Sequence, residues 1–240
     1  MSLTLIATVH PEYAATGTAI NCSSALNVAA GDLLVACCGW EGAASSGFKV
    51  ADSDGSTNVM DLLAEVKGTS VNNFCRIGYK IAASAKASST IRLSSTASLT
   101  NVYFVVYQFR PDSGETVTKD AGPSAASSNG STAVQTGNIS TTGTDEVVLA
   151  VVRNYLNSVK SSFLIAEGAP DGYDESPSFP AFATWYKLFT SAQSNVHAQV
   201  TIATSTYWDS DIIAFKSAAA AGGGNVVPQI AVYLNCKRTS

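Results

Sequence analysis

The sequence is poor in charged residues and in the residue types that carry most enzyme chemistry. Only 13% of the residues are charged, two are histidine, and the net charge of −4 is spread without runs of one sign. Because no basic stripe could follow a phosphate backbone, we expect no nucleic-acid ligand. Gly-x-Ser-x-Gly, His-Glu-x-x-His and phosphate-loop motifs are missing, so we expect a protein that is not an enzyme.

Long apolar segments are missing as well. Residues 1–9 contain no lysine or arginine, and the apolar run at residues 3–7 is too short for a signal peptide or a membrane span. We therefore expect no membrane insertion.

The five cysteines form no Cys-x-x-Cys pair and have no histidine at metal-ligand spacing. The sequence therefore predicts neither a zinc site nor a cofactor. Cys37 and Cys75 fit small apolar side chains on buried strands, because free cysteine is among the most often buried residues. Cys236, near the C-terminus, is the candidate for a disulfide between subunits.

One stretch of the sequence occurs twice. Each copy opens with Tyr-Lys, at residues 79–80 and 186–187, and closes with an aromatic-basic pair, at residues 109–110 and 215–216. Between these ends apolar and polar residues alternate with the period of half-buried strands. We expect an all-β, antiparallel β-sandwich or jelly roll built from two pseudo-repeats, residues 1–112 and 113–216, that form one body or two. Residues 217–240 are expected to be a linker and a C-terminal extension strand.

The clearest strand patterns lie in the middle of each repeat. Continuous apolar runs at residues 33–38 and 147–152 predict strands buried on both faces. Residues 102–109 predict a central strand, because they are β-branched and aromatic throughout. Residues 166–180 contain three prolines, two glycines and several carboxylates in place of a strand pattern, and predict a long loop.

Two sets of acidic residues could suggest a metal site or a catalytic site, and each set has a simpler interpretation. Asp52 and Asp54 lie in a segment that resembles a calcium loop, but its twelfth position is Leu63, so a plain turn is favoured over a metal site. Asp171, Asp174 and Glu175 could supply an acid pair for glycoside cleavage. Because they cluster on one proline-rich loop, whereas carboxylates that flank a sugar normally come from separate rigid elements, we do not expect catalysis there.

Aromatic residues near strand ends are the better candidates for a binding surface. Exposed aromatic rings stack on sugars, while nearby polar side chains bond the hydroxyl groups. Ordinary core packing is the competing interpretation of each residue. The carbohydrate-binding candidates are Trp40, Tyr173, Trp185, Tyr186, Tyr207 and Trp208.

The C-terminal segment predicts an assembly strand. Ile230, Val232 and Leu234 form an alternate apolar row after a glycine-rich linker, and nothing in that linker could cover them. Addition of this strand to the sheet edge of another subunit would bury the row, and Cys236 could then lock the contact.

Several segments occur in the order of a known module. They are Gly31-Asp32-Leu33-Leu34-Val35, Asp52-Ser53-Asp54-Gly55, Tyr107-Gln108-Phe109, Asp145-Glu146-Val147-Val148-Leu149 and Ile213-Ala214-Phe215-Lys216. In this order the chain resembles a poorly characterised two-repeat β-sandwich module of bacterial surface and secreted proteins and of bacteriophage structural proteins. The sequence departs from the module at Ser56, where the module has Asn. The resemblance covers turns and core strands, so it implies a fold and carries over no catalytic residue.

Together these features predict a non-enzymatic structural or assembly protein. The leading expectation is a bacteriophage virion component, such as a capsid decoration, neck or tail protein, whose partners are other virion subunits or further copies of itself. The alternative is a secreted or cell-surface carbohydrate-binding or adhesion module with glycans as ligands.

Overall fold

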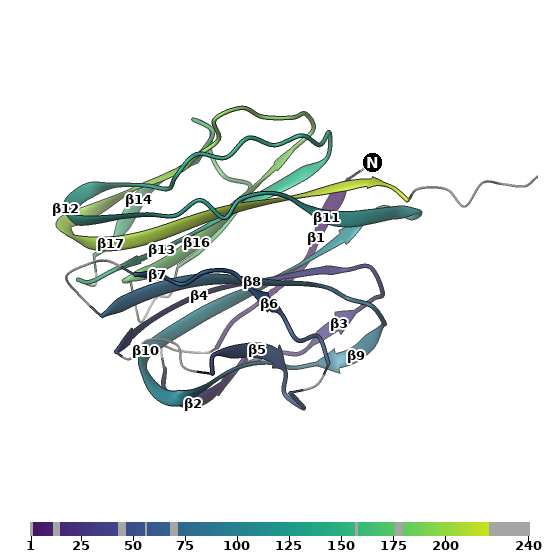
Figure 1. Cartoon of the computed structure of the whole chain (residues 1–240), viewed down its shortest axis with the longest axis horizontal. Coiled ribbons are helices and arrows are strands. Elements are labelled where there is room, and N and C mark those ends of the chain that lie inside the picture. Colours follow the sequence, from purple (N-terminus) through teal and green to yellow (C-terminus); the bar gives the residue numbers. More distant parts are fainter. Residues whose placement is uncertain are drawn as a thin grey trace, which may run out of the picture.

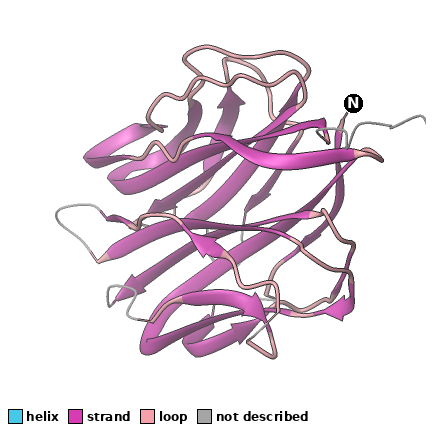
Figure 2. Cartoon of the chain, turned by 45° about the vertical axis from the view of Figure 1, so that its right-hand side comes forward, coloured by secondary structure: helices cyan, strands magenta, loops and turns pink. Residues whose placement is uncertain are grey.

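The computed structural model describes residues 2–11, 15–42, 47–55, 57–67, 72–156, 158–175 and 180–220. The predicted all-β fold is confirmed, since Figure 2 shows strands and loops and no helix in the described part. Accordingly, none of the described residues belongs to an apolar helix of membrane-spanning length. The strands are β1 (Leu3–Val9), β2 (Ala15–Asn21), β3 (Leu26–Val28), β4 (Leu33–Gly42), β5 (Lys49–Asp52), β6 (Asp61–Leu62), β7 (Val66–Lys67), β8 (Asn73–Ile81), β9 (Lys86–Ser89), β10 (Ile91–Pro111), β11 (Glu115–Ala121), β12 (Ala126–Gln135), β13 (Glu146–Asn154), β14 (Lys160–Ile165), β15 (Gly172–Glu175), β16 (Phe182–Phe189) and β17 (Ala198–Ala219).

The two halves of the chain form two antiparallel sheets with the same strand order. The first sheet runs β1-β10-β4-β8-β6, and the second runs β11-β17-β13-β16-β15. In each sheet further strands pair with the long last strand, β2 and β5 with β10, and β12 and β14 with β17. The sheets lie face to face, with the first half below and the second half above in Figure 1. The two halves that the sequence repeat predicted therefore share one strand order.

The strands β10 and β17 each belong to two layers. Residues 91–94 of β10 pair with β5, whereas residues 103–109 pair with β4. In the same way, β17 pairs with β14 through residues 198–202 and with β13 through residues 208–216. Irregular register in the middle of β10 lets the strand change direction. Each half is therefore a small sandwich whose inner layer faces the other half.

Alternation along the inner strands fills three cores. In β4, Leu33, Val35 and Cys37 face the junction between the halves. The residues between them, such as Leu34 and Cys38, face the outer layer of their own half. The continuous apolar run that predicted a strand buried on both faces is explained by this position, because water reaches neither face.

The junction between the halves is made of reciprocal contacts. Phe109 packs edge-on against Tyr186, with ring centroids 5.4 Å apart, and Phe215 packs edge-on against Tyr79 at 5.0 Å. Phe109 and Phe215 occupy equivalent places, since they pair with Leu33 in β4 and Val147 in β13. Contacts that are exchanged in this way are the mark of a two-fold interface. The halves therefore face one another like the subunits of a symmetric dimer.

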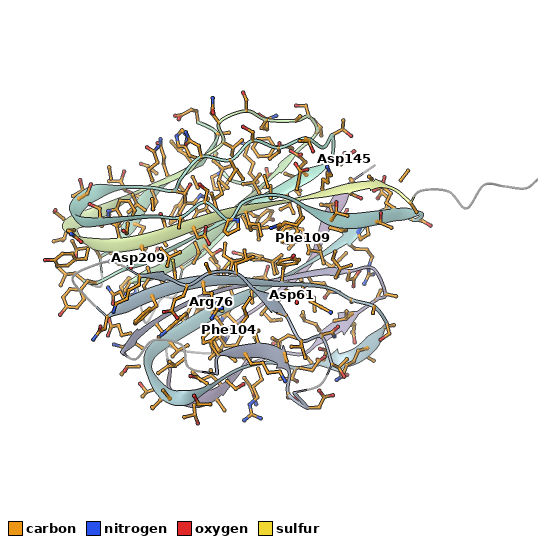
Figure 3. The ribbon with its side chains drawn as sticks, in the orientation of Figure 1. Asp61, Arg76, Phe104, Phe109, Asp145 and Asp209 are labelled. Atoms are coloured by element: carbon orange, nitrogen blue, oxygen red, sulfur yellow. The ribbon has the colours of Figure 1, made fainter. Side chains whose placement is uncertain are left out.

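One end of the junction is polar. The buried Arg153 of β13 bonds Glu41 of β4 and the carbonyl oxygen of Asn154. Gly39 lies opposite, and a Cβ atom there would come within 2.4 Å of the Phe182 ring and 3.2 Å of Arg153 Cδ. Asp209 marks this end in Figure 3, and Phe109 marks the aromatic end. The absence of a side chain at Gly39 makes room mainly for the Phe182 ring, beside which Arg153 extends toward Glu41.

Two expectations about segments need correction. The expected loop at residues 166–180 contains a short strand, β15, which pairs with β16. Four residues without proline are enough for a strand at the edge of a sheet, because only one side of it is paired. Ala218 and Ala219, expected in the linker, pair with β11 as the end of β17.

Candidate functional site: a cleft at the junction of the halves

A cleft of about 670 Å³ opens where the edge strand β15 approaches the first half. The first half contributes His10, at the end of β1, and Tyr103, from β10. The second half contributes residues from β15 and from the segments that precede β14 and β16, namely Val159, Tyr173, Asp174, Glu175 and Pro180. Because both halves line the cleft, the site exists only when they are packed together.

The inner wall of the cleft is aromatic. Tyr103 packs edge-on against Phe182 at 5.5 Å, and its ring lies 5.8 Å from the His10 ring. The Tyr103 hydroxyl group donates a hydrogen bond of 3.4 Å to Asp174 Oδ1. Burial raises the pKa of Tyr103, with the nearby Asp174 acting in the same direction, so this hydroxyl group remains a donor.

The rim of the cleft carries an aromatic ring held from below. Tyr173 is 63% exposed. Its ring stacks on Phe163 with centroids 4.9 Å apart and planes inclined by 16°. Phe163 in turn packs edge-on against the buried Trp185, whose Nε1 donates to the Leu164 carbonyl oxygen. A column of three rings thus leads from the core to the surface and fixes the outermost ring.

The two carboxylates of the cleft differ in their surroundings. Lys160 contacts Glu175 at 3.3 Å and bonds the carbonyl oxygen of Pro180, so it ties two parts of the cleft wall together. Burial lowers the pKa of Lys160 to about 8, although Glu175 opposes the shift. Burial raises the pKa of Asp174, against the influence of His10 and of the Tyr103 hydrogen bond.

Four of the six aromatic candidates are not surface residues. Trp40, Trp185, Tyr186 and Trp208 are all buried, so their assignment as sugar-stacking residues is wrong. Trp40, for example, stacks on Phe74 at 5.3 Å inside the first half. Position at a strand end did not expose these rings. The outer layers of the two sandwiches cover Trp40, Trp185 and Trp208, whereas the first half covers Tyr186 across the junction.

Trp208 is buried although acidic residues stand beside it in the sequence. Asp209 and Asp211 follow it, and polar neighbours of this kind would suit an exposed ring. Successive side chains of a strand point to opposite faces. Trp208 and Ile212 therefore lie in the core of the second half, whereas Asp209 and Asp211 point toward the junction.

The remaining two candidates reach the surface. Tyr173 forms the rim of the cleft, and Tyr207 is half-buried, with its ring 6.3 Å from that of Tyr155. The pattern of the sequence missed His10, Tyr103 and Val159, which line the cleft from other elements. Val159 could have been found from the sequence, because it is an apolar residue in a loop between two strands. In the structure it is 64% exposed.

The other predicted sites have structural roles or lie outside the described residues. Asp54 accepts hydrogen bonds from the Thr57 backbone and forms a 2.7 Å ion pair with Lys86. Asp52 is buried and accepts from Ser89. Among the described residues no group of three or more His, Cys, Asp or Glu side chains could hold a metal ion. The assembly-strand residues Ile230, Val232 and Leu234, and Cys236, lie outside the described residues.

The cysteines of the first half are buried free thiols, as expected for Cys37 and Cys75. Burial raises the pKa of Cys37 to about 12, despite a hydrogen bond with Thr184. It raises the pKa of Cys75 as well, and the nearby Asp209 and Asp211 add to that shift. These thiols are unreactive side chains of the core.

No protein-family model, no curated protein and no solved structure matches the chain. The geometry of the cleft is therefore what points to a function.

Proposed function

We propose that the chain is a non-enzymatic glycan-binding protein and that the cleft between its halves holds the sugar. The observation that carries the proposal is Tyr173, an exposed ring fixed on Phe163 at the rim of a cleft that also offers Asp174 and Glu175. Sugar rings present apolar faces that stack on aromatic side chains, and hydroxyl groups that bond carboxylates. An aromatic ring held in place loses little conformational entropy when it binds.

The two carboxylates serve binding in this proposal. Glu175 forms an ion pair with Lys160, and Asp174 accepts a hydrogen bond from the hydroxyl group of Tyr103. Both carboxylates lie on one short strand, whereas those that cleave a glycosidic bond face one another across the sugar. The arrangement suits hydrogen bonds to a ligand that is retained and released unchanged.

The test is binding to a panel of polysaccharides by the protein and by the Tyr173→Ala variant. We expect the variant to lose retention on whichever polysaccharide holds the unmodified protein, because the exposed ring supplies the stacking surface. Tyr155→Ala is the matched control, since Tyr155 is 48% exposed on the same half but does not line the cleft. The proposal fails if the unmodified protein binds no glycan, or if both variants bind as it does.

Assignment to a bacteriophage virion stays a prediction. It was drawn from the lack of an evident signal peptide, the few charged residues, the sandwich and the terminal strand around Ile230 and Val232, which lies outside the described residues. The two functions are compatible, because a virion protein that attaches to sugars on a cell surface would need both a binding cleft and a docking strand.

A further inference from the structure

Among the described residues, no lysine or arginine forms an ion pair with the Asp174 carboxylate in the cleft. Its hydrogen bond within the described part of the chain comes from a neutral hydroxyl group, that of Tyr103, at 3.4 Å. The other carboxylate, Glu175, is engaged by Lys160. His10 lies near enough to lower the pKa of Asp174, but its Nδ1 contacts the carbonyl oxygen of Pro11 at 2.8 Å.

A half-buried carboxylate without a cation is costly. It has lost part of its hydration, and a single long hydrogen bond replaces little of it. The raised pKa of Asp174 agrees with this, since burial is its largest cause. A ligand that brings a positive charge to Asp174 would gain a charge-assisted hydrogen bond, which is stronger than a bond from a hydroxyl group.

The same ligand can reach the aromatic rim. Strand β15 is the last strand of the second sheet in the described part of the chain, and its residues 173–175 line the cleft. Tyr173 and Asp174 are consecutive residues of that strand and therefore point to its two faces, with Cα atoms about 3.8 Å apart. Both residues line the cleft, so one ligand that lies across the edge of the strand can contact the Tyr173 ring and the Asp174 carboxylate.

We propose that the cleft selects amino sugars, which are sugar units with a free, protonated amino group, over neutral and N-acetylated sugars. The inference rests on the proposed function and names the ligand class of that site. The ammonium group bonds Asp174 while the sugar ring stacks on Tyr173. Acetylation of the amine removes the charge and leaves Asp174 with only the neutral hydroxyl group of Tyr103.

The experiment is calorimetric titration of the full chain with three soluble oligosaccharides of equal length. These are a glucosamine oligomer, its N-acetylated form and a neutral glucose oligomer. We expect the glucosamine oligomer to bind about tenfold or more tightly than the other two, the scale of one hydrogen bond between charged groups. Its affinity should also fall as salt is added.

Two variants locate the effect. Asp174→Asn keeps the shape of the side chain and removes its charge, so it should abolish the preference for the amine. Asp61→Asn makes the same chemical change at an exposed residue of β6, which lies on the first half and is labelled in Figure 3, and should preserve the preference. Thermal melting of both variants checks that they fold, and the comparison of three ligands on the unmodified protein needs no variant.

Each contrary result has its own meaning. Equal binding of all three oligomers, unchanged by Asp174→Asn, would overturn the selectivity for amines and leave the glycan-binding proposal standing. Binding of putrescine as tight as that of the glucosamine oligomer would also overturn it, because the sugar ring would then contribute nothing. If none of the oligomers and no polysaccharide binds, the proposed function itself falls.

Discussion

Phe109 packs edge-on against Tyr186 across the junction, and the equivalent residues Phe215 and Tyr79 repeat the contact with the halves exchanged. An interface of this kind is self-complementary, as in a symmetric homodimer. Here both copies of the surface belong to one chain, so the contact forms at an effective concentration set by the short connection between β10 and β11.

Double-mutant cycles on the two aromatic pairs should give similar coupling energies. Replacing Phe109 and Tyr186 by Leu, singly and together, is expected to reveal a coupling of about 0.5–1.5 kcal/mol in urea unfolding. The Phe215 and Tyr79 cycle should match it. The cycle of Phe109 with Phe215, which have no ring contact with one another in the described structure, is the control and should give a value near zero. Coupling in only one aromatic pair would contradict the two-fold relation.

Removing the charge of Glu41 should destabilise the protein strongly. Arg153 is completely buried, and Glu41 is the carboxylate that bonds its Nη2 atom. Loss of one partner leaves a buried charge with less compensation, so Glu41→Gln is expected to cost about 3–5 kcal/mol in urea unfolding. Glu167→Gln is the matched control, because Glu167 pairs with His197 but is 68% exposed, and should cost less than about 1 kcal/mol. Equal effects would show that the pair at the junction does not hold Arg153.

Asp211 should make stability depend on pH. Burial raises its pKa to about 7, against hydrogen bonds from the Ile212 and Ser124 backbone, and its Oδ2 atom has no hydrogen-bond partner among the described residues. The unfolded chain ionises near pH 4. Between these values the folded state holds the proton more tightly, so the stability contributed by Asp211 is present below pH 4 and lost as the pH rises to 7.

The Asp211→Asn variant has no carboxyl group to ionise at this position, so it does not lose this stability as the pH rises. We expect the variant to be more stable than the unmodified protein at pH 8, by up to about 4 kcal/mol, and the difference to close near pH 4. Urea unfolding at pH 4, 6 and 8 measures it, with the exposed Asp61→Asn as control. A difference that is the same at all three values would mean that Asp211 does not titrate in this range.

Deletion of residues 222–240 should leave a folded protein that no longer assembles. The strands of the described residues lie between Leu3 and Ala219 and pair with one another in both sheets, so we expect them to fold without residues 222–240. Circular dichroism and light scattering after size-exclusion chromatography test folding and assembly separately. Cys236→Ser should assemble but lose any cross-link that a reducing agent breaks. Unfolding of the truncated chain would instead make the segment part of its own domain.

The sequence predicted the sheets well because their signal is local. Continuous apolar runs, as at residues 147–152, and the repeated Tyr-Lys pairs reflect burial on strands that each half builds from nearby residues. The short strand β15 was missed because it has few residues and stands between prolines.

The cleft could not be predicted in the same way. His10 and Tyr103 are far from Tyr173 in the sequence, and only the packing of the halves brings them together. The sequence does not show whether an outer layer will cover an aromatic residue at a strand end. Trp40 is therefore buried and Tyr173 exposed, although both were predicted near strand ends. Predicting the cleft would have required knowing first how the two halves pack about their pseudo-two-fold axis.

The two-fold relation between the halves is broken at the cleft, and this sets its valency. Tyr103 and Phe182 meet beside the cleft, whereas the equivalent residues, Asp209 and Cys75, meet inside the polar junction, where β7 also contacts β17. Two identical subunits would have carried such a cleft twice, but fused halves are free to differ. The described part of each chain therefore presents this cleft once, so the proposed glycan binding, combined with the predicted assembly, would gain strength through avidity among assembled chains.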